Sequence, residues 1–315
     1  MAPGSRISGR IVRADFNALE SVLLYTRAAH RLGLWKSERL LIERFFPDHA
    51  APLLEAGCGA GRATFGLWEL GYRNLTAFDF AEELLDQARS RAAELDATAL
   101  RFHHADATQP RQLRALLPVA KQPGQSNVLR DKATARPERD KTDTCHVIRD
   151  KPATPPSDHG PPSTGHGPLF AGALFLFNGL MQIPGRRARR RALRSLAAVL
   201  EPGAPLLFTT HDRDEPDELH LWEAEAKRWA AGTQDPRLHE YGDRYFDHEH
   251  GRTFMHLPNR AETLADLEAT GWSPEYDAMR SDLARESAAV KDFSDNCRFW
   301  LVRRELCEQT VVSDK

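Results

Sequence analysis

Five short segments between residues 52 and 104 alternate between two patterns, and this alternation constrains the fold more than any other feature. Three are brief, mostly apolar runs of strand length, and two are longer runs in which apolar residues recur every three or four positions. The expected order is strand, helix, strand, helix, strand, at Pro52–Ala56, Ala63–Leu70, Leu75–Phe78, Glu82–Leu95 and Leu100–His104. Strands that alternate with helices in this way are typical of a parallel sheet with helices on both faces.

The alternation stops at a segment with the composition of a disordered chain. Eight of the 20 prolines lie between residues 121 and 168, and charges of both signs are frequent there. Such a segment buries too little apolar surface to offset the entropy of ordering it. We therefore expect a disordered insertion over residues 120–168, before the fourth strand. The alternative is an arm that binds a partner.

Strand and helix patterns resume after this insertion. Further strands are expected at Phe170–Phe177, Pro205–Thr210, Glu275–Arg280 and Arg298–Arg303, and further helices at Ala188–Leu200, 216–231 and Ala261–Ala269. The predicted fold class is α/β, with a doubly wound, seven-stranded, mostly parallel sheet. Residues 15–46 also have helical patterns and predict an N-terminal helical extension. In that extension we expect Tyr25, Trp35 and Phe46 to be core aromatics.

The overall composition argues against several kinds of partner. The 315 residues carry a net charge of −2, which gives no reason to expect a nucleic acid or an anionic membrane. The four cysteines form no CxxC pair, so neither a zinc site nor a disulfide framework is indicated, and a cytoplasmic setting fits best. The longest apolar run, Leu169–Met181, has 13 residues and is too short to span a bilayer.

A glycine-rich loop directly follows the first expected strand. Gly57, Gly59 and Gly61 stand between that strand and the next helix, where glycines permit a tight turn and the close approach of a ligand. Ligands of open α/β sheets bind at the carboxyl ends of the strands, so the loop is also in the right place. Arg62 occupies the position of the third glycine in the dinucleotide pattern GxGxxG, which disfavours a dehydrogenase. The loop also lacks the lysine and hydroxyl of a P-loop, which disfavours ATP.

Two aspartates follow the second and third expected strands. A carboxylate at Asp79 can accept hydrogen bonds from both hydroxyls of a ribose, and Phe80 can pack against an adenine. Asp106 is placed to accept a hydrogen bond from the adenine amino group. Either aspartate alone would more often cap a helix. Together with the loop, in this order on consecutive strands, they predict a site for an adenosine-containing cofactor.

This combination resembles the class I S-adenosylmethionine-dependent methyltransferases, whose fold is Rossmann-like, from Leu53 to about Arg303. The resemblance implies S-adenosyl-L-methionine as cofactor, with Glu55 engaging its methionyl amino group through the loop. The cofactor-binding residues expected are Glu55, Gly57, Cys58, Gly59, Gly61, Asp79, Phe80, Asp106, Ala107 and Phe177. The chain then divides into an N-terminal helical cap (1–48), a methyltransferase domain (49–305) and a flexible tail (306–315).

Three later stretches, at residues 177–185, 208–213 and 293–300, resemble a bacterial methyltransferase-domain group of unassigned substrate. One departure from the family pattern is Ala171, because an aspartate usually stands there after the phenylalanine that opens the fourth strand. The lost aspartate and the large insertion leave open a non-catalytic protein that binds S-adenosylmethionine.

Two residues at strand ends are candidates for the catalytic step. Asn178, after the fourth expected strand, offers an amide beside the methyl group. Its Phe-Asn-Gly-Leu sequence differs from the Asn/Asp-Pro-Pro-Tyr motif of enzymes that methylate nucleobase amino groups, so that activity is disfavoured. His211, after the fifth strand, titrates near neutral pH and suits a general base. The alternative for His211 is a surface residue in a polar loop.

Residues 214–258 lie between the fifth strand and the last helix, where such folds place a substrate lid. His248 and His250 would share a face of an extended chain, which suits a metal ion. The HExxH spacing of helix-borne zinc sites is absent, so a solvated lid without a metal is the preferred interpretation.

A run of arginines begins the helix after the fourth strand, at Arg186, Arg187, Arg189, Arg190 and Arg191. It is either a solvated helix face or a patch for an anionic substrate such as RNA, and the net charge favours the first. We therefore expect a methyltransferase that acts on a small molecule, as a monomer or homodimer, without a nucleic-acid or membrane partner. The alternatives are an RNA methyltransferase that uses the arginine run and a cofactor-binding protein without catalysis.

Overall fold

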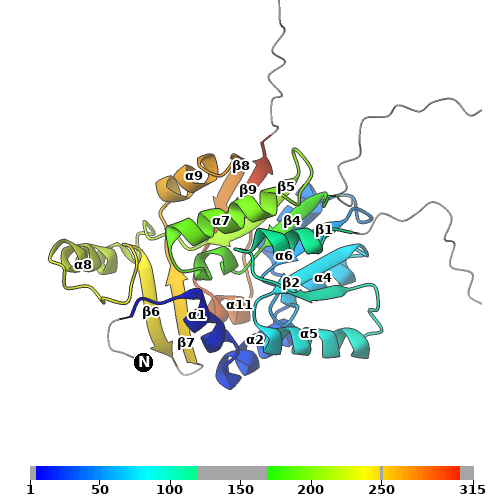
Figure 1. Cartoon of the computed structure of the whole chain (residues 1–315), viewed down its shortest axis with the longest axis horizontal. Helices are drawn as coiled ribbons and strands as arrows, with labels where there is room; N and C mark the ends of the chain where they lie inside the picture. The colour runs from blue at the N-terminus through cyan, green and yellow to red at the C-terminus, as the bar shows by residue number, and fades with distance from the viewer. Residues whose placement is uncertain (1–4, 119–168, 249–250, 306–315) are drawn as a thin grey trace, which may run out of the picture. The chain divides into compact units, whose positions relative to one another are not determined.

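A seven-stranded sheet forms the centre of the structure (Figure 1). The computed structural model describes residues 5–118, 169–248 and 251–305. The strand order is β3-β2-β1-β4-β5-β9-β8, and β9 runs antiparallel to both of its neighbours. The strands are β1 (Leu53–Ala56), β2 (Leu75–Asp79), β3 (Arg101–His104), β4 (Gly172–Phe175), β5 (Pro205–Thr210), β8 (Trp272–Met279) and β9 (Arg298–Arg304). The predicted α/β fold with a mostly parallel sheet of seven strands is confirmed.

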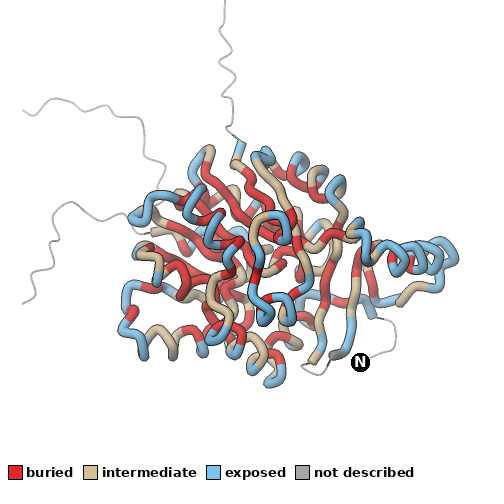
Figure 2. Tube along the Cα trace, turned by 180° about the vertical axis from the view of Figure 1, so that it is seen from behind, coloured by how far each residue is buried: buried red, intermediate tan, exposed pale blue. Residues whose placement is uncertain are grey.

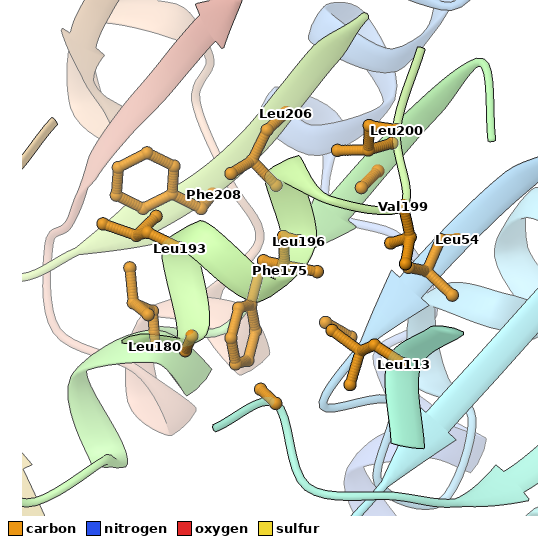
Figure 3. Close-up of a cluster of buried hydrophobic side chains, with 14 of the residues drawn as sticks. Leu54, Leu113, Phe175, Leu180, Leu193, Leu196, Val199, Leu200, Leu206 and Phe208 are labelled. Carbon is orange, nitrogen blue, oxygen red and sulfur yellow. The ribbon is translucent and has the colours of Figure 1, made fainter. Parts of the chain in front are cut away.

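Helices cover both faces of the sheet, because its central strands are buried on both sides. One face carries α6 (Pro110–Ala115), α7 (Arg186–Ala197) and α9 (Arg260–Glu268), and the other carries α3 (Lys36–Phe45), α4 (Arg62–Glu69) and α5 (Glu82–Glu94). Successive residues of a strand serve opposite faces, so Leu206 and Phe208 belong to the first core and Leu207 to the second. Figure 3 shows the first core, where Leu193 and Leu196 of α7 lie over the sheet.

The N-terminal helical extension consists of α1 (Gly9–Phe16), α2 (Leu19–Arg31) and α3. Ser8 caps α1 by accepting a hydrogen bond from the amide of Ile11. Three further helices, α8 (Leu219–Ala230), α10 (Arg280–Leu283) and α11 (Ala288–Phe293), follow β5 and β8. Figure 2 shows the contrast between the buried strands of the main sheet and the largely exposed α8.

An antiparallel hairpin, β6 (Asp243–His248) and β7 (Gly251–His256), lies within the region predicted to be a lid. It packs against α1 and against the 3₁₀ turn η1 (Gly179–Gln182), and Figure 1 shows α1 beside β7. The polar composition of residues 239–256 did not indicate strands. Two strands form there because Phe254 is fully buried among residues of α1 and α2 while the polar residues beside it pair with one another.

The fourth strand is shorter than the expected Phe170–Phe177. β4 ends at Phe175, and Phe177 and Asn178 have φ angles of +56° and +57°, which no strand contains. The insertion predicted over 120–168 and the tail predicted over 306–315 lie outside the described residues. Within the described part of the chain, no helix is both long and apolar enough to cross a membrane.

Candidate functional site

A pocket lies at the carboxyl ends of β1, β2 and β4, beside the glycine-rich loop. It encloses roughly 880 Å³ of empty space, part of which is open solvent. The lining residues come from the strand ends, the loop, the N-terminal helices and η1. They are Phe16, Tyr25, Ala28, Glu55, Gly57, Cys58, Gly59, Ala60, Arg62, Ala63, Phe78, Asp79, Phe80, Leu84, Ala105, Asp106, Ala107, Phe175, Leu176, Phe177, Gly179, Gln182 and Ile183.

The loop depends on its glycines for its course. Gly57, Gly59 and Gly61 have φ angles of +64°, +52° and +83°, a region that other residues rarely adopt. A Cβ on Gly57 would lie 2.7 Å from the ring of Phe175, and one on Gly61 would lie 2.6 Å from the ring of Phe65. A Cβ on Gly59 would meet no atom nearer than 3.9 Å, so the loop is open there. The backbone of Gly59 can thus approach a ligand in the pocket closely.

Asp79, at the end of β2, connects this loop to the helix that follows. Its Oδ2 accepts a hydrogen bond from the amide of Gly59 and its Oδ1 accepts one from the amide of Ala81, both at 2.8 Å. Burial raises the pKa of Asp79, and the hydrogen bonds from these amides oppose that shift. Each carboxylate oxygen can accept a second hydrogen bond. Asp79 therefore stabilises the start of α5 and also offers acceptors to the pocket.

Asp106, which follows β3, already has hydrogen-bond partners within the chain on both of its carboxylate oxygens. Its Oδ1 accepts hydrogen bonds from the amide and hydroxyl of Thr108, at 2.8 and 2.7 Å. Its Oδ2 lies 3.1 Å from Nη2 of Arg13 in α1. Arg13 therefore ties the N-terminal extension to the strand end where we expect the adenine. Sequence patterns did not reveal Arg13, because nothing in the chain marks a pairing across 93 residues.

Glu55, the third residue of β1, places a buried carboxyl group against the pocket. The hydroxyl of Thr64 donates a hydrogen bond to its Oε2 at 2.5 Å. Burial raises the pKa of Glu55 to about 7, although the hydrogen bond from Thr64 and the charge of Arg62 act in the opposite direction. A cationic group beside Glu55 would favour its ionised form.

Arg62, the first residue of α4, joins the helix that follows the glycine-rich loop to the N-terminal extension. Its guanidinium forms a bidentate ion pair with Glu38 of α3, at 2.6 and 2.7 Å, and both side chains are buried. The guanidinium also lies 4.8 Å from the ring centroid of Trp35 and 5.5 Å from that of Phe177. These contacts fix the N-terminal extension to the glycine-rich loop.

Aromatic side chains of the N-terminal extension reach the pocket. Tyr25 and Phe16 both line it, and their ring centroids are 5.4 Å apart. Tyr25 packs against the core formed by residues of α1 and α2, as expected, and also lines the pocket, while Trp35 and Phe46 are buried in the core. Burial raises the pKa of Tyr25 to about 12, and its hydroxyl hydrogen-bonds with Gln182. The phenol thus stays neutral at the pocket wall.

Asn178, in the chain after β4, makes polar contacts with residues that do not line the pocket. Asn178 is 3% exposed, and its backbone N–H donates a hydrogen bond to the Thr209 hydroxyl at 2.8 Å. Its Nδ2 lies 3.1 Å from Nε2 of His211, and Nδ1 of His211 lies 3.1 Å from the carbonyl oxygen of Asn296. Burial lowers the pKa of His211, against the effect of that carbonyl. His211 is therefore a neutral ring with both nitrogens engaged.

Comparison with known proteins adds a sequence match at this part of the chain. Residues 53–116, which include the glycine-rich loop and both aspartates, match the family described as a methyltransferase domain. The match covers the first three expected strands and the two helices between them. Among curated proteins, no sequence matches the chain.

Solved structures with a similar fold extend over nearly the whole chain. An S-adenosylmethionine-dependent methyltransferase from Methanosarcina mazei is 15% identical, with a TM-score of 0.54 over 87% of this chain and 100% of its own. The [4+2]-cyclase SpnF is 14% identical, with a TM-score of 0.53 over 96% and 98%. A 1,6-didemethyltoxoflavin-N1-methyltransferase from Burkholderia thailandensis, with bound S-adenosylhomocysteine, is 15% identical, with a TM-score of 0.50 over 94% and 88%.

These likenesses confirm the Rossmann-like fold of class I S-adenosylmethionine-dependent methyltransferases. Sequence identities this low establish a shared fold but not a shared reaction, and one of the three proteins is a cyclase. The acceptor must therefore be argued from the site itself.

Most residues that the sequence predicts to contact a cofactor meet at this pocket. Those that line it are Glu55, Gly57, Cys58, Gly59, Asp79, Phe80, Asp106, Ala107 and Phe177. Gly61 shapes the loop from outside the lining. Asn178 and His211 are not lining residues, although Phe177 and Gly179 on either side of Asn178 are. Their roles toward a cofactor or an acceptor stay predictions.

Two further features of the sequence, the suggested metal pair and the arginine run, lie outside the lining of the pocket. His250 and the side chain of His248 lie outside the described residues. Arg189 is 1% exposed and ion-paired with Glu240, while Arg186 and Arg190 both contact Asp266. The interpretation of the whole run as a solvated helix face is therefore wrong for its buried and paired members. Arg187 and Arg191 are exposed.

Proposed function

We propose that this chain binds S-adenosyl-L-methionine and transfers its methyl group to a small-molecule acceptor. The observation that carries the proposal is the pocket at the ends of β1 to β4, in which Glu55, Asp79 and Asp106 face one space. The bound cofactor supplies an activated methyl group on a sulfonium. The protein then has to bind, orient and exclude water rather than activate the donor.

The pocket residues fit such a cofactor in three places. The glycine-rich loop has an open backbone at Gly59, where a ligand can approach. Asp79 retains acceptor capacity for two ribose hydroxyls after its bonds to Gly59 and Ala81. Glu55 is a buried carboxyl whose raised pKa would fall when a methionyl ammonium group arrives beside it.

A small acceptor is supported better than RNA by the surroundings of the pocket. Phe16 and Tyr25 of the N-terminal helices form part of its wall, together with Phe78, Phe80 and Phe177. Three of the five arginines in the run form ion pairs with acidic groups of the same chain. They are therefore not free for a phosphate backbone. The structurally similar 1,6-didemethyltoxoflavin-N1-methyltransferase was solved with bound 1,6-didemethyltoxoflavin.

The proposal extends to the helical cap, the lid region and the oligomeric state expected from the sequence. Residues 1–48 would act as a cap and 214–258 as a lid on the substrate, in a cytoplasmic monomer or homodimer. The Arg13–Asp106 ion pair and the packing of α1 against β7 support a connected cap and lid.

Calorimetry followed by label transfer tests the proposal. S-adenosylmethionine and S-adenosylhomocysteine should both bind, and label from the methyl group should enter the small-molecule fraction of a cell extract. Absence of binding would contradict the proposal together with both alternatives. Label in RNA, with a steep dependence on salt, would favour the RNA alternative. Binding without any transfer would favour the non-catalytic alternative.

A further inference from the structure

Two neighbouring helices, α6 and α7, carry a concentrated positive charge. They contain two and six arginines respectively and no acidic residue, and they contact one another. Arg186, Arg189 and Arg190 are paired with carboxylates of the chain. The remaining arginines are exposed and form no ion pair with any described residue. We call them the arginine face, and they are Arg111, Arg114, Arg187, Arg191 and Arg194.

The arginines of α7 that belong to this face lie along one side of the helix. Arg187, Arg191 and Arg194 are four and three residues apart, which places them above one another on a helix. Leu193 and Leu196 pack into the core on the opposite side of α7. Guanidinium groups bind carboxylates with two parallel hydrogen bonds. A surface rich in carboxylates is therefore a suitable complement to this face.

The helix α8 and the turn before it carry the opposite charge. Residues 214–226 include six acidic side chains and no lysine or arginine. Glu225 is buried and paired with Arg228. The other five form no ion pair within the described part of the chain. We call residues 214–223 the acidic segment, and its carboxylates are Asp214, Glu215, Asp217, Glu218 and Glu223.

The acidic segment also exposes large apolar side chains. Leu219 and Leu221 are 44% and 50% exposed, and Figure 2 shows that most of α8 is uncovered. Contact with another protein would bury these leucines, because the apolar stems of arginine side chains can cover them. RNA offers no such cover, and its phosphates would be repelled by the carboxylates beside them.

The arginine face and the acidic segment match each other in length and in charge. The helices α7 and α8 each have 12 residues, so each is about 18 Å long. Five guanidinium groups on one surface and five carboxylates on the other have no ionic partner among the described residues. One chain thus presents both halves of a complementary contact that it does not make with itself.

We propose that two copies of this chain form a dimer in which the acidic segment of each copy lies on the arginine face of the other. The same contact is then made twice about a two-fold axis, which is the commonest symmetry of homodimers. The net charge of each copy is only −2, so no strong overall repulsion opposes association. Neither surface lines the pocket, and the proposal is therefore independent of the proposed methyl transfer.

Sedimentation equilibrium of the full-length protein tests whether this dimer forms. A dimer is expected at micromolar concentrations in about 0.05 M salt. Its dissociation constant should rise at least about tenfold in about 0.5 M salt, because salt screens exposed charges. A wild type that stays monomeric up to about 0.1 mM in low salt would overturn the proposal.

Charge reversal tests which surfaces meet. R111E/R187E/R191E reverses most of the charge of the arginine face, and D214K/D217K/E223K reverses most of that of the acidic segment. Each variant alone then presents two surfaces of like sign, so its dissociation constant should be at least about a hundredfold higher than that of the wild type. In an equimolar mixture the surfaces are complementary again, and a dimer with one copy of each variant should form.

The matched control reverses three exposed arginines elsewhere on the chain. Arg10, Arg27 and Arg31 lie on α1 and α2 and form no ion pair with described residues, so R10E/R27E/R31E should dimerise as the wild type does. Circular dichroism checks that all three variants are folded. A mixture that stays monomeric, or a single variant that dimerises as tightly as the wild type, would overturn the proposal. A monomeric wild type whose arginine face binds polyuridylic acid would overturn it in favour of a nucleic-acid partner.

Discussion

Two buried groups of charged residues differ in whether their carboxyl groups remain free to accept hydrogen bonds from a ligand. The pocket cluster consists of Glu38, Glu55, Arg62 and Asp79. Glu55, Arg62 and Asp79 line the proposed cofactor site, and Glu38 pairs with Arg62. The hairpin cluster lies where β6 and β7 meet α7 and α9, and consists of Arg189, Arg213, Glu240, Asp243, His256 and Glu262. The first retains acceptor capacity toward an open space, while the carboxyl groups of the second are bonded to charged groups of the chain itself.

The hairpin cluster has the connections of a structural anchor. Nδ1 and Nε2 of His256 each lie 2.8 Å from a carboxylate oxygen, of Asp243 and Glu262 respectively. Both ring nitrogens therefore donate, and the ring is a cation. Although burial opposes charge on both groups, hydrogen bonds with these carboxylates raise the pKa of His256, and those from His256 and Arg213 lower the pKa of Glu262 to about 2. Glu240, Asp243 and His256 lie close enough for a metal ion, but these contacts account for their arrangement.

The comparison teaches that buried charge alone does not mark a site. Charges that are balanced within the chain stabilise a particular arrangement of elements. Charges that keep free lone pairs toward a cavity are available to a ligand. The predictions below test this difference, from the largest expected effect to the smallest.

Replacing His256 by leucine should destabilise the fold most. H256L leaves Asp243 and Glu262 buried without their shared donor, at a cost of about 3–5 kcal/mol in the free energy of unfolding. Urea unfolding measures the loss, with H220A on the exposed face of α8 as the matched control. Folded H256L should still bind S-adenosylhomocysteine, since His256 does not line the pocket. Unchanged stability combined with lost cofactor binding would reverse the roles assigned to the two clusters.

The pH dependence of stability should follow from the same cation. The folded-state pKa of His256 is raised above its unfolded value, so its contribution is complete below the unfolded pKa of about 6.5. It is lost as pH rises through the folded pKa. The difference in unfolding free energy between the wild type and H256L should therefore shrink toward alkaline pH, and a difference that grew with pH would contradict a cationic His256.

Replacing Asp79 by alanine should have the next largest effect, on cofactor affinity rather than on folding. D79A removes the acceptor for the ribose and releases the amides of Gly59 and Ala81. Hydrogen bonds to a charged group contribute about 1.5–3 kcal/mol, so we expect roughly a hundredfold weaker binding of S-adenosylhomocysteine by calorimetry. D86A, on the exposed side of α5, is the control and should bind as the wild type does. A loss below threefold in D79A would place the ribose elsewhere.

Two members of the pocket cluster, Glu55 and Asp79, could be predicted from the sequence because they belong to local patterns, whereas the pairing of Glu38 with Arg62 could not. Glu55, the loop glycines and Asp79 follow or end consecutive apolar strands, and parallel strands bring their carboxyl ends to one edge. The same logic placed Asn178 and His211 at neighbouring strand ends, where they form a hydrogen bond. Such residues need only the strand order to meet.

The hairpin cluster could not be predicted in this way. Arg189 and Glu240 are separated by 51 residues, and no spacing rule relates them. The arginine run was interpreted as a solvated face because sequence periodicity shows only which side of a helix is apolar. It does not show that acidic side chains from other elements lie against the polar side of that helix. Tyr25 shows the same limit, since an amphipathic helix indicates an inward face without indicating whether a core or a cavity lies there.

The smallest expected effect concerns Glu55 and follows from its raised pKa. The carboxyl titrates at about 7 in the free protein, and a methionyl ammonium group would bind only its ionised form well. Above pH 7 the affinity for S-adenosylhomocysteine should be constant. Below pH 7 it should fall by about tenfold per pH unit, because ionising Glu55 then costs free energy that binding must supply.

E55Q provides the matched control for this pH dependence. Its amide keeps the size of the side chain and the contact with the Thr64 hydroxyl but cannot ionise. Its affinity should be weaker than that of the wild type at pH 8 and nearly independent of pH between 5.5 and 8. If E55Q retained the full slope, the titrating group would lie elsewhere in the pocket, and Asp79, whose pKa burial also raises, would be the next residue to test. The slope therefore shows which carboxyl group of the pocket cluster is available to a ligand, whereas the carboxyl groups of the hairpin cluster are paired with cations of the chain itself.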